Sequence, residues 1–148
     1  MSRFARILCP IDFSQPSEAA LAHAEEIART FGAELLVAHV VEPMIYPVAY
    51  GMPPVAPIDY EDAAKTSAAK ALEPVVARLA KAGVKASPVV DTGAASMRIC
   101  ELVKERKCDL VVLATHGYTG LKHVLLGSTA ERVVRHCSCP VLTVKAPG

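Results

Sequence analysis

The sequence has almost no net charge and no long hydrophobic run. Sixteen Lys and Arg residues against fifteen Asp and Glu residues leave a formal charge of +1. This balance gives no electrostatic footprint for nucleic acid or an anionic membrane, and we expect neither as a partner. No apolar run approaches the ~20 residues that span a bilayer. Asp12 also lies where a signal peptide would still need apolar residues, so we expect a cytoplasmic protein.

The cysteines lack the spacing of a metal site. Cys137 and Cys139 are separated by one residue, whereas a zinc knuckle usually has two between its thiols, and no second pair matches them. The other three are Cys9, Cys100 and Cys108, and several of the five fall in apolar segments, where a thiol behaves as a small hydrophobe. The sequence favours reduced thiols and no metal site, with metal or redox chemistry as the alternative.

What the chain does have is abundant core material in an alternating pattern. Hydrophobic residues make up 52% of its 148 positions, enough for one domain over residues 1–148. Continuous apolar runs predict strands, and apolar residues that recur every three or four positions predict helices. The expected strands are 4–11, 34–41, 84–91, 109–115 and 140–145, and the expected helices lie between Ser14 and Gly32 and at 60–82, 95–106 and 128–137. This order predicts a doubly wound α/β domain, a five-stranded parallel sheet with helices on both faces.

Three segments carry local signals of their own. Residues 42–58 hold five of the eleven prolines and are expected to form a long loop of the kind that often carries function. Pro74 is expected to kink the helix 60–82 because it removes a backbone donor. Pro88 is expected to interrupt the strand 84–91 and weaken it.

Such sheets bind ligands beyond the carboxyl ends of their strands, where the winding changes direction. If the first and fourth strands are neighbours, Asp12 and Gly117 face the same crevice. Gly117 and Gly120 allow a tight loop, and Gly127-Ser128-Thr129 opens a helix whose unpaired N–H groups attract an anion such as phosphate.

Each of these signals also has a structural explanation. Asp12 is also suited to accept hydrogen bonds at the turn before Ser14. Ser128 and Glu131 have the spacing of a capping box, which explains the serine without a ligand. His39 lies in an apolar strand and is interpreted as a satisfied core histidine.

Three basic residues, His116, Lys122 and His123, flank the loop between the fourth strand and the last helix. They could add positive charge near a phosphate. A solvated surface loop is the favoured interpretation.

The spacing Ala114-x2-Gly117-x9-Gly127-Ser128 closely resembles the Gly-x2-Gly-x9-Gly-Ser/Thr loop of the universal stress protein family. Pro10-Ile11-Asp12 and the segment 139–144 resemble the two ends of that family, so the likeness covers essentially the whole chain. It implies a Rossmann-like fold of the adenine nucleotide alpha hydrolase type and, in the ATP-binding members, an ATP ligand. The positions carried over are Pro10, Ile11, Asp12, Val40, Ala114, Gly117, Gly127, Ser128 and Thr129.

The resemblance implies a role for each part of this site. Asp12 would meet the ribose or adenine side of the nucleotide, and Val40 would hold the adenine through its backbone. Gly117 and Gly127 would let the phosphates approach the main chain. Ser128 and Thr129, at the start of the helix after Gly127, would donate hydrogen bonds to phosphate oxygens. Mg2+ could accompany the nucleotide at Asp12, although one carboxylate is thin support for a metal site.

Ala114 departs from the family pattern because it replaces the first glycine of the loop. Its methyl group restricts positive φ and narrows a close approach. The phosphate donors at Gly117 and at residues 127–129 remain, so ATP binding stays the expectation.

The leading hypothesis is therefore an ATP- or adenine-nucleotide-binding regulatory protein of the stress response that acts through its conformation or an unknown protein partner. A slow ATPase is an alternative, but the Gly-x4-Gly-Lys-Ser/Thr motif and a paired acid for a catalytic water are missing, so no catalytic residue is assigned. A nucleotide-free interaction module is the other alternative, favoured by Ala114 and the loop 42–58.

The last strand, 140–145, predicts a homodimer. It is expected at the edge of the sheet, where its uncharged residues 141–144 leave backbone groups unprotected. Identical edges pair across a twofold axis, and the family resemblance points the same way. The alternative is a monomer whose edge is covered by the loop 42–58.

Overall fold

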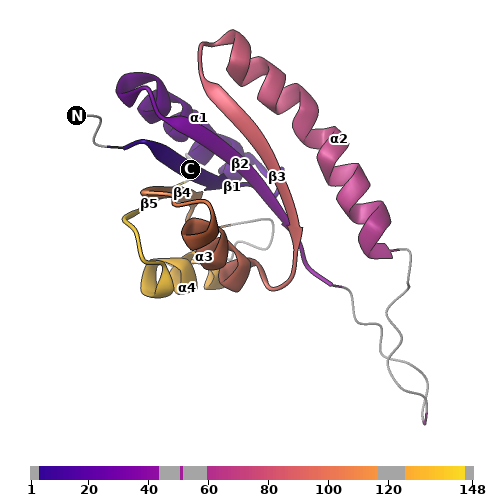
Figure 1. Ribbon diagram of the computed structural model, residues 1–148. Coiled ribbons are helices and arrows are strands. Elements are labelled where there is room, and N and C mark those ends of the chain that lie inside the picture. Colours follow the sequence, from indigo (N-terminus) through magenta and orange to yellow (C-terminus); the bar gives the residue numbers. More distant parts are fainter. Residues whose placement is uncertain (1–3, 44–50, 52–59, 117–125, 146–148) are drawn as a thin grey trace.

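The computed structural model describes residues 4–43, 51, 60–116 and 126–145. These residues form five strands and four helices in strict alternation, as the sequence predicts (Figure 1). In chain order they are β1 Arg6–Pro10, α1 Gln15–Phe31, β2 Glu34–Val41, α2 Tyr60–Lys81, β3 Lys85–Thr92, α3 Ala95–Glu105, β4 Leu110–Ala114, α4 Ser128–His136 and β5 Val141–Val144.

The strands form one parallel sheet in the order β3-β2-β1-β4-β5. The chain winds outward from β1 to β2 and β3, then returns to place β4 on the other side of β1. The winding therefore changes direction between β1 and β4, so the first and fourth strands are neighbours, which is the condition on which the predicted crevice depends. This is the point where open α/β sheets bind their ligands.

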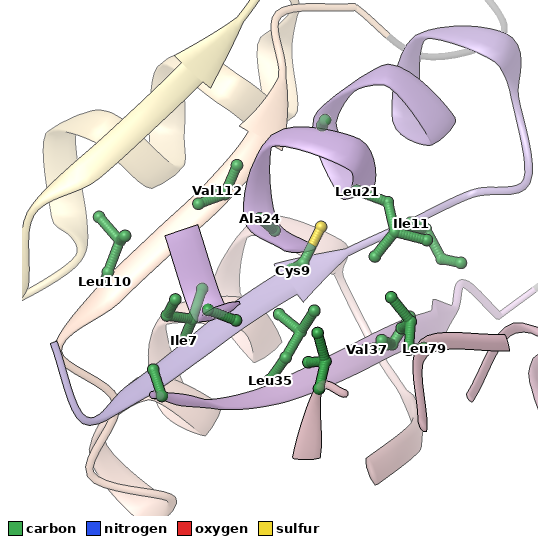
Figure 2. Packing of buried hydrophobic residues seen from close by; sticks show 14 of the residues in the cluster. Ile7, Cys9, Ile11, Leu21, Ala24, Leu35, Val37, Leu79, Leu110 and Val112 are labelled. Carbon is green, nitrogen blue, oxygen red and sulfur yellow. The ribbon is translucent and has the colours of Figure 1, made fainter. Parts of the chain in front are cut away.

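Helices cover both faces of the sheet, with α1 and α2 on one side and α3 and α4 on the other. Alternate residues of each strand supply the two cores because successive side chains point to opposite faces. Ile7 and Cys9 of β1 pack with α1 and α2, as Figure 2 shows, whereas Leu8 packs with α3 and α4. All three side chains are fully buried.

The expected signals at the two ends of α1 are confirmed. Ser14 is the N-cap, and its Oγ accepts a hydrogen bond from the Ser17 N–H at 3.3 Å. Gly32 ends the helix in the left-handed conformation, with φ of 67°. Both helix ends could be predicted from the sequence because a capping serine and a left-handed glycine act through their own local hydrogen bonds and backbone conformation.

Pro88 does not interrupt β3, contrary to expectation. All eight residues of β3 pair with β2, Pro88 included. Gly93 N donates to Val41 O, so the backbone groups of the odd-numbered β3 residues face β2 and those of Pro88 face the open edge. The missing N–H of proline costs no hydrogen bond there. The helix α2 also runs continuously through Pro74, and the kink expected at that residue stays a prediction.

Within the described residues, no helix combines the length and the apolar character that crossing a membrane requires.

Candidate functional site

The predicted site lies at the carboxyl edge of β1 and β4. The residue after each strand is hydrogen-bonded to the neighbouring strand on the far side from the crevice. After β1, Ile11 N donates to Ala38 O of β2 at 2.7 Å, and after β4, Thr115 N donates to Val144 O of β5 at 3.0 Å. Among the described residues, β1 and β4 pair at two positions near their amino ends, whereas β1 and β2 pair at five. In the described part of the sheet, the carboxyl halves of β1 and β4 are thus paired with β2 and β5 and not with one another, at the winding reversal where such sheets bind ligands.

Asp12 follows β1 directly and organises the turn into α1. Its Oδ1 accepts a hydrogen bond from the Ser14 N–H at 3.0 Å and a second, close one from the Ser14 hydroxyl. Phe13 between them adopts a left-handed φ of 64°, which is uncommon for a bulky residue and fits this tight turn. The structural role that the sequence allowed for Asp12 is therefore confirmed. Its role toward a ribose, an adenine or Mg2+ stays a prediction.

His39 is a satisfied, partly buried histidine, as expected, and it also supports the strand end that carries Asp12. Its Nδ1 lies 2.8 Å from the Ile11 carbonyl oxygen. A carbonyl can only accept, so Nδ1 carries the proton. The ring also packs against Phe13, with centroids 5.0 Å apart. The sequence did not connect His39 with the site because the two segments are distant along the chain.

The backbone of Val40 faces the side of β2 on which β1 lies. Because Ile11 N donates to Ala38 O, the backbone groups of Ala38 point toward β1. Backbone groups alternate in direction along a strand, so those of Val40 point the same way. The last paired residue of β1 is Pro10, opposite Ala38, and Val40 lies beyond it. The polar backbone groups of Val40 therefore sit at the carboxyl edge, beside the end of β1.

The start of α4 is held tightly against the end of β4. Gly127 is the N-cap residue, and its N–H donates to Thr115 O at 2.7 Å. A Cβ on Gly127 would lie 2.9 Å from that same oxygen and 3.7 Å from His116 Cα. Only glycine fits this approach without a shift of the backbone. Ser128 and Thr129 are thereby placed beside the end of β4.

The capping box predicted for Ser128 is wrong. Ser128 is the first helical residue and not the cap, because the contact with Thr115 puts Gly127 in the cap position. The N-cap Gly127 makes no side-chain cap hydrogen bond, and Ser128 is exposed. Glu131 instead forms an ion pair with Arg135 one turn later, at 2.7 Å. Among the described residues, the first N–H groups of α4 thus have no side-chain acceptor like the one that Ser14 supplies to α1, and they keep their attraction for an anion.

Ala114 is an ordinary strand residue, in register with Val144. Among the described residues other than glycine, only Phe13 and Lys107 have a positive φ. The concern that the methyl group of Ala114 forbids a needed positive φ was therefore wrong, because the backbone is extended there. Compared with the glycine of the family pattern, Ala114 therefore only adds one methyl group beside the predicted site.

Several predicted site residues lie outside the described residues. They are Gly117, Gly120, Lys122 and His123, together with most of the loop 42–58. Among the residues that are described, no group of three or more His, Cys, Asp or Glu side chains is arranged to hold a metal ion.

A cluster of charged side chains lies between β3 and α3, where Asp91 is in register with Val40. The Arg98 guanidinium forms ion pairs with Asp91, Glu101 and Glu105. Burial raises the pKa of Asp91, but hydrogen bonds from Arg98 and the Thr92 N–H outweigh it, and the net pKa is lowered. One cation shared by three carboxylates ties the helix to the strand, and we assign the cluster a structural role.

Comparison with known proteins agrees with the fold and the family pattern. The sequence model of the Universal stress protein family matches residues 3–145. Universal stress protein MJ0531 of Methanocaldococcus jannaschii is 36% identical over 145 residues, covering 97% of this chain and 84% of that protein. The structure of universal stress protein UspA from Lactobacillus plantarum is similar with a TM-score of 0.82 at 26% identity, covering 97% of this chain and 99% of that one.

Two more distant structures contain a nucleotide. A universal stress protein in complex with cAMP has a TM-score of 0.72 at 23% identity, covering 97% of this chain and 98% of that one. A universal stress protein family protein from Arabidopsis thaliana with AMP bound has a TM-score of 0.65 at 22% identity, covering 97% of this chain and 93% of that one. These two likenesses concern the fold. The family match and the M. jannaschii relative cover nearly all of the sequence, and the chain belongs to the universal stress protein family.

Proposed function

We propose that this universal stress protein binds ATP at the carboxyl edge between β1 and β4 and signals through its conformation or a protein partner in the cytoplasm. It belongs to a stress-response family, and two structural neighbours were solved with the adenine nucleotides cAMP and AMP. The identification of the nucleotide as ATP, the accompanying Mg2+ and the residues that bind them are our own proposals.

The start of α4, which no described side chain caps, carries the proposal. Gly127 is fixed to Thr115 O, so the first turn of the helix is held rigidly at the place where the winding reverses. The N–H groups of Ser128 and Thr129, together with the helix dipole, supply the positive end that phosphate oxygens need. Their two hydroxyl groups can donate as well. In this proposal Gly117 completes the phosphate loop.

The opposite end of the nucleotide would lie over β1 and β2. The backbone groups of Val40 face the side of β1 beyond its last paired residue, and an adenine edge offers one donor and one acceptor to match them. Asp12 stands between the two ends of the site, where a carboxylate can accept from ribose hydroxyl groups. Its Oδ1 already accepts from Ser14, so this role falls to Oδ2.

A nucleotide-free interaction module is the second candidate. The observation in its favour is Ala114, whose methyl group occupies the place of the glycine in the ATP-binding loop. The two candidates differ in one measurable property, which is whether the purified protein binds ATP at equilibrium.

We also propose a homodimer that forms through β5. This strand ends the sheet, and Leu142 at its centre is one of the exposed large hydrophobic residues, 39% accessible. An apolar edge with free backbone groups pairs readily with a second copy.

Replacing Ser128 with proline tests the nucleotide site without the steric conflict that any residue at Gly127 would cause. Proline is favoured at the first position of a helix, and the φ of −66° and ψ of 159° at Gly127 suit a residue before proline. The variant therefore keeps the helix and removes one N–H donor. Ser128→Ala is the matched control, since it removes the hydroxyl group and keeps the N–H.

The parent is expected to bind labelled ATP, and Ser128→Pro to bind it about 10 to 150 times more weakly, which corresponds to one hydrogen bond to a charged group of about 1.5–3 kcal/mol. Ser128→Ala should lose less. Equal affinity of Ser128→Pro and Ser128→Ala would contradict the phosphate site. A parent that binds no ATP would favour the interaction module, and phosphate release over hours would show a slow ATPase.

A further inference from the structure

Outside the nucleotide site, a cavity of about 410 Å³ lies between α3 and α4, which pack side by side (Figure 1). Cys100 of α3 lines it, together with three basic side chains, Lys104, Arg132 and His136. The lining contains one acidic residue, Glu101, so its two permanent cations, Lys104 and Arg132, outnumber its carboxylates. A partly exposed thiol therefore shares a solvent-connected space with an excess of positive charge.

A second thiol contacts Cys100 from the end of α4. Cys137 is the residue that ends this helix, and its side chain is hydrogen-bonded to that of Cys100. Both cysteines are only partly buried. Cys137 is the C-cap of α4, with φ of −67° and ψ of 144°, and its N–H still donates to Val133 O at 3.0 Å. Two thiols on adjoining elements are thus within reach of one another.

The remaining cysteines are less suited to react. Cys9 is completely buried in the core, and desolvation raises its pKa to about 12. Cys108 is buried as well, and its pKa is raised to about 11, chiefly by desolvation. Desolvation also raises the pKa of Cys139. Burial keeps Cys9 and Cys108 away from a dissolved disulfide, and Cys139 is not among the residues that line the cavity.

We propose that Cys100 is a site of reversible oxidation by anionic low-molecular-weight disulfides, with Cys137 as the thiol that resolves the adduct into a Cys100–Cys137 disulfide. The positive lining of the cavity selects a negatively charged disulfide, such as oxidised glutathione, over a neutral one. The product would fasten α3 to the end of α4. This site is independent of nucleotide binding.

The chemistry balances as two thiol–disulfide exchanges. The Cys100 thiolate attacks one sulfur of the disulfide, a mixed disulfide forms on Cys100, and the first small thiolate leaves and takes a proton. Cys137 then loses its proton to solvent and attacks the Cys100 sulfur, which forms the protein disulfide and expels the second small thiolate. Two protein thiols are oxidised while one small disulfide is reduced to two thiols. Desolvation and the hydrogen bond with Cys100 raise the pKa of Cys137, so the second exchange is the slower one.

The test uses the reduced full-length protein, oxidised glutathione and intact-mass spectrometry. The parent should gain one glutathionyl group and then end two hydrogen atoms lighter than it began. Cys137→Ser should stop at the mixed disulfide, and Cys100→Ser should form neither product. Cys139→Ser, which removes the neighbouring thiol, is the matched control and should react as the parent does.

Charge reversal tests the selectivity. Arg132→Glu should slow the reaction with oxidised glutathione roughly three- to tenfold and leave the reaction with neutral hydroxyethyl disulfide unchanged. Arg135→Glu, on the same helix but outside the cavity lining, should change neither rate.

Three results would overturn the proposal. They are a glutathionyl group that maps by peptide analysis of the parent to Cys9, Cys108 or Cys139, full oxidation of Cys100→Ser, or equal slowing of both disulfides by Arg132→Glu. Mapping on the parent decides the question even if a cysteine variant does not fold.

Discussion

Replacing Thr143 with proline tests the proposed dimer at the outer edge of β5. Val111 N donates to Pro140 O, and Thr115 N donates to Val144 O, both at 3.0 Å. Backbone groups alternate in direction along a strand, so the even-numbered residues of β5 face β4 and Thr143 faces the open edge. The N–H of Thr143 is therefore available to a second copy and is not used inside the protomer.

The size of the effect follows from this alternation. In a twofold dimer, Thr143→Pro removes two equivalent hydrogen bonds, worth roughly 1–3 kcal/mol together, which weakens the dimer about 5- to 150-fold. The protomer loses no internal hydrogen bond, so its free energy of unfolding should change by less than about 1 kcal/mol. Leu142→Pro is the matched control, because it removes a donor that faces β4. It leaves the carbonyl of the buried Val111 unpaired, which costs about 1–3 kcal/mol of protomer stability.

Light scattering over a micromolar concentration series measures the dimer, and urea unfolding measures the protomer. We expect a dimeric parent, a Thr143→Pro protein that is folded and more weakly associated, and a Leu142→Pro protein that is less stable. A monomeric parent would refute the dimer outright. A Thr143→Pro variant with unchanged association would show that the contact lies elsewhere on the molecule.

Three further predictions concern single residues. Asp91→Asn should lower the free energy of unfolding in urea at pH 7 by roughly 1 kcal/mol, since the pair with Arg98 is partly solvated. Because the folded pKa of Asp91 is lowered, this contribution is present above the unfolded pKa of about 3.9 and is lost as the pH falls through the folded pKa, so parent and variant should converge in acid. Ala114→Gly should leave ATP affinity unchanged or higher in an equilibrium titration, while thermal unfolding shows a loss of about 0.5–1 kcal/mol for glycine in a strand. Gly127→Ala should lower the melting temperature even without nucleotide, because its Cβ would lie 2.9 Å from Thr115 O; an unchanged melting temperature would show that the backbone yields easily.

The order of the elements could be predicted because each one carries its own local signal. The apolar run 34–41 coincides with β2, and Ser14 and Gly32 mark the two ends of α1 as expected. The sequence also placed the last strand at the edge of the sheet, because that is its usual position in such windings, and the strand order confirms it. Local chemistry and general topology were sufficient because neither depends on which distant atoms touch.

The details of the site could not be predicted in the same way. Gly127 and Ser128 are both common cap residues, and the choice between them was made by Thr115 O, twelve positions earlier in the sequence. The expectation for Pro88 failed for a similar reason, because its backbone faces the open edge only once β3 is placed outermost in the sheet. A tertiary neighbour decided each case, and a single sequence does not reveal that neighbour.

Tertiary contacts also determine at which residues a substitution gives an informative test of ligand binding. Asp12 and Gly127 match the family motif, yet the structure accounts for both without a nucleotide: one accepts from Ser14, and the other fits against Thr115. A variant at either position would damage the protein whether or not ATP binds, so weaker binding there would prove little. Ser128 differs, because it is exposed, no described side chain caps its helix, and its position tolerates proline. Its N–H is a donor that none of the described residues uses, so removing that donor gives a cleaner test of function.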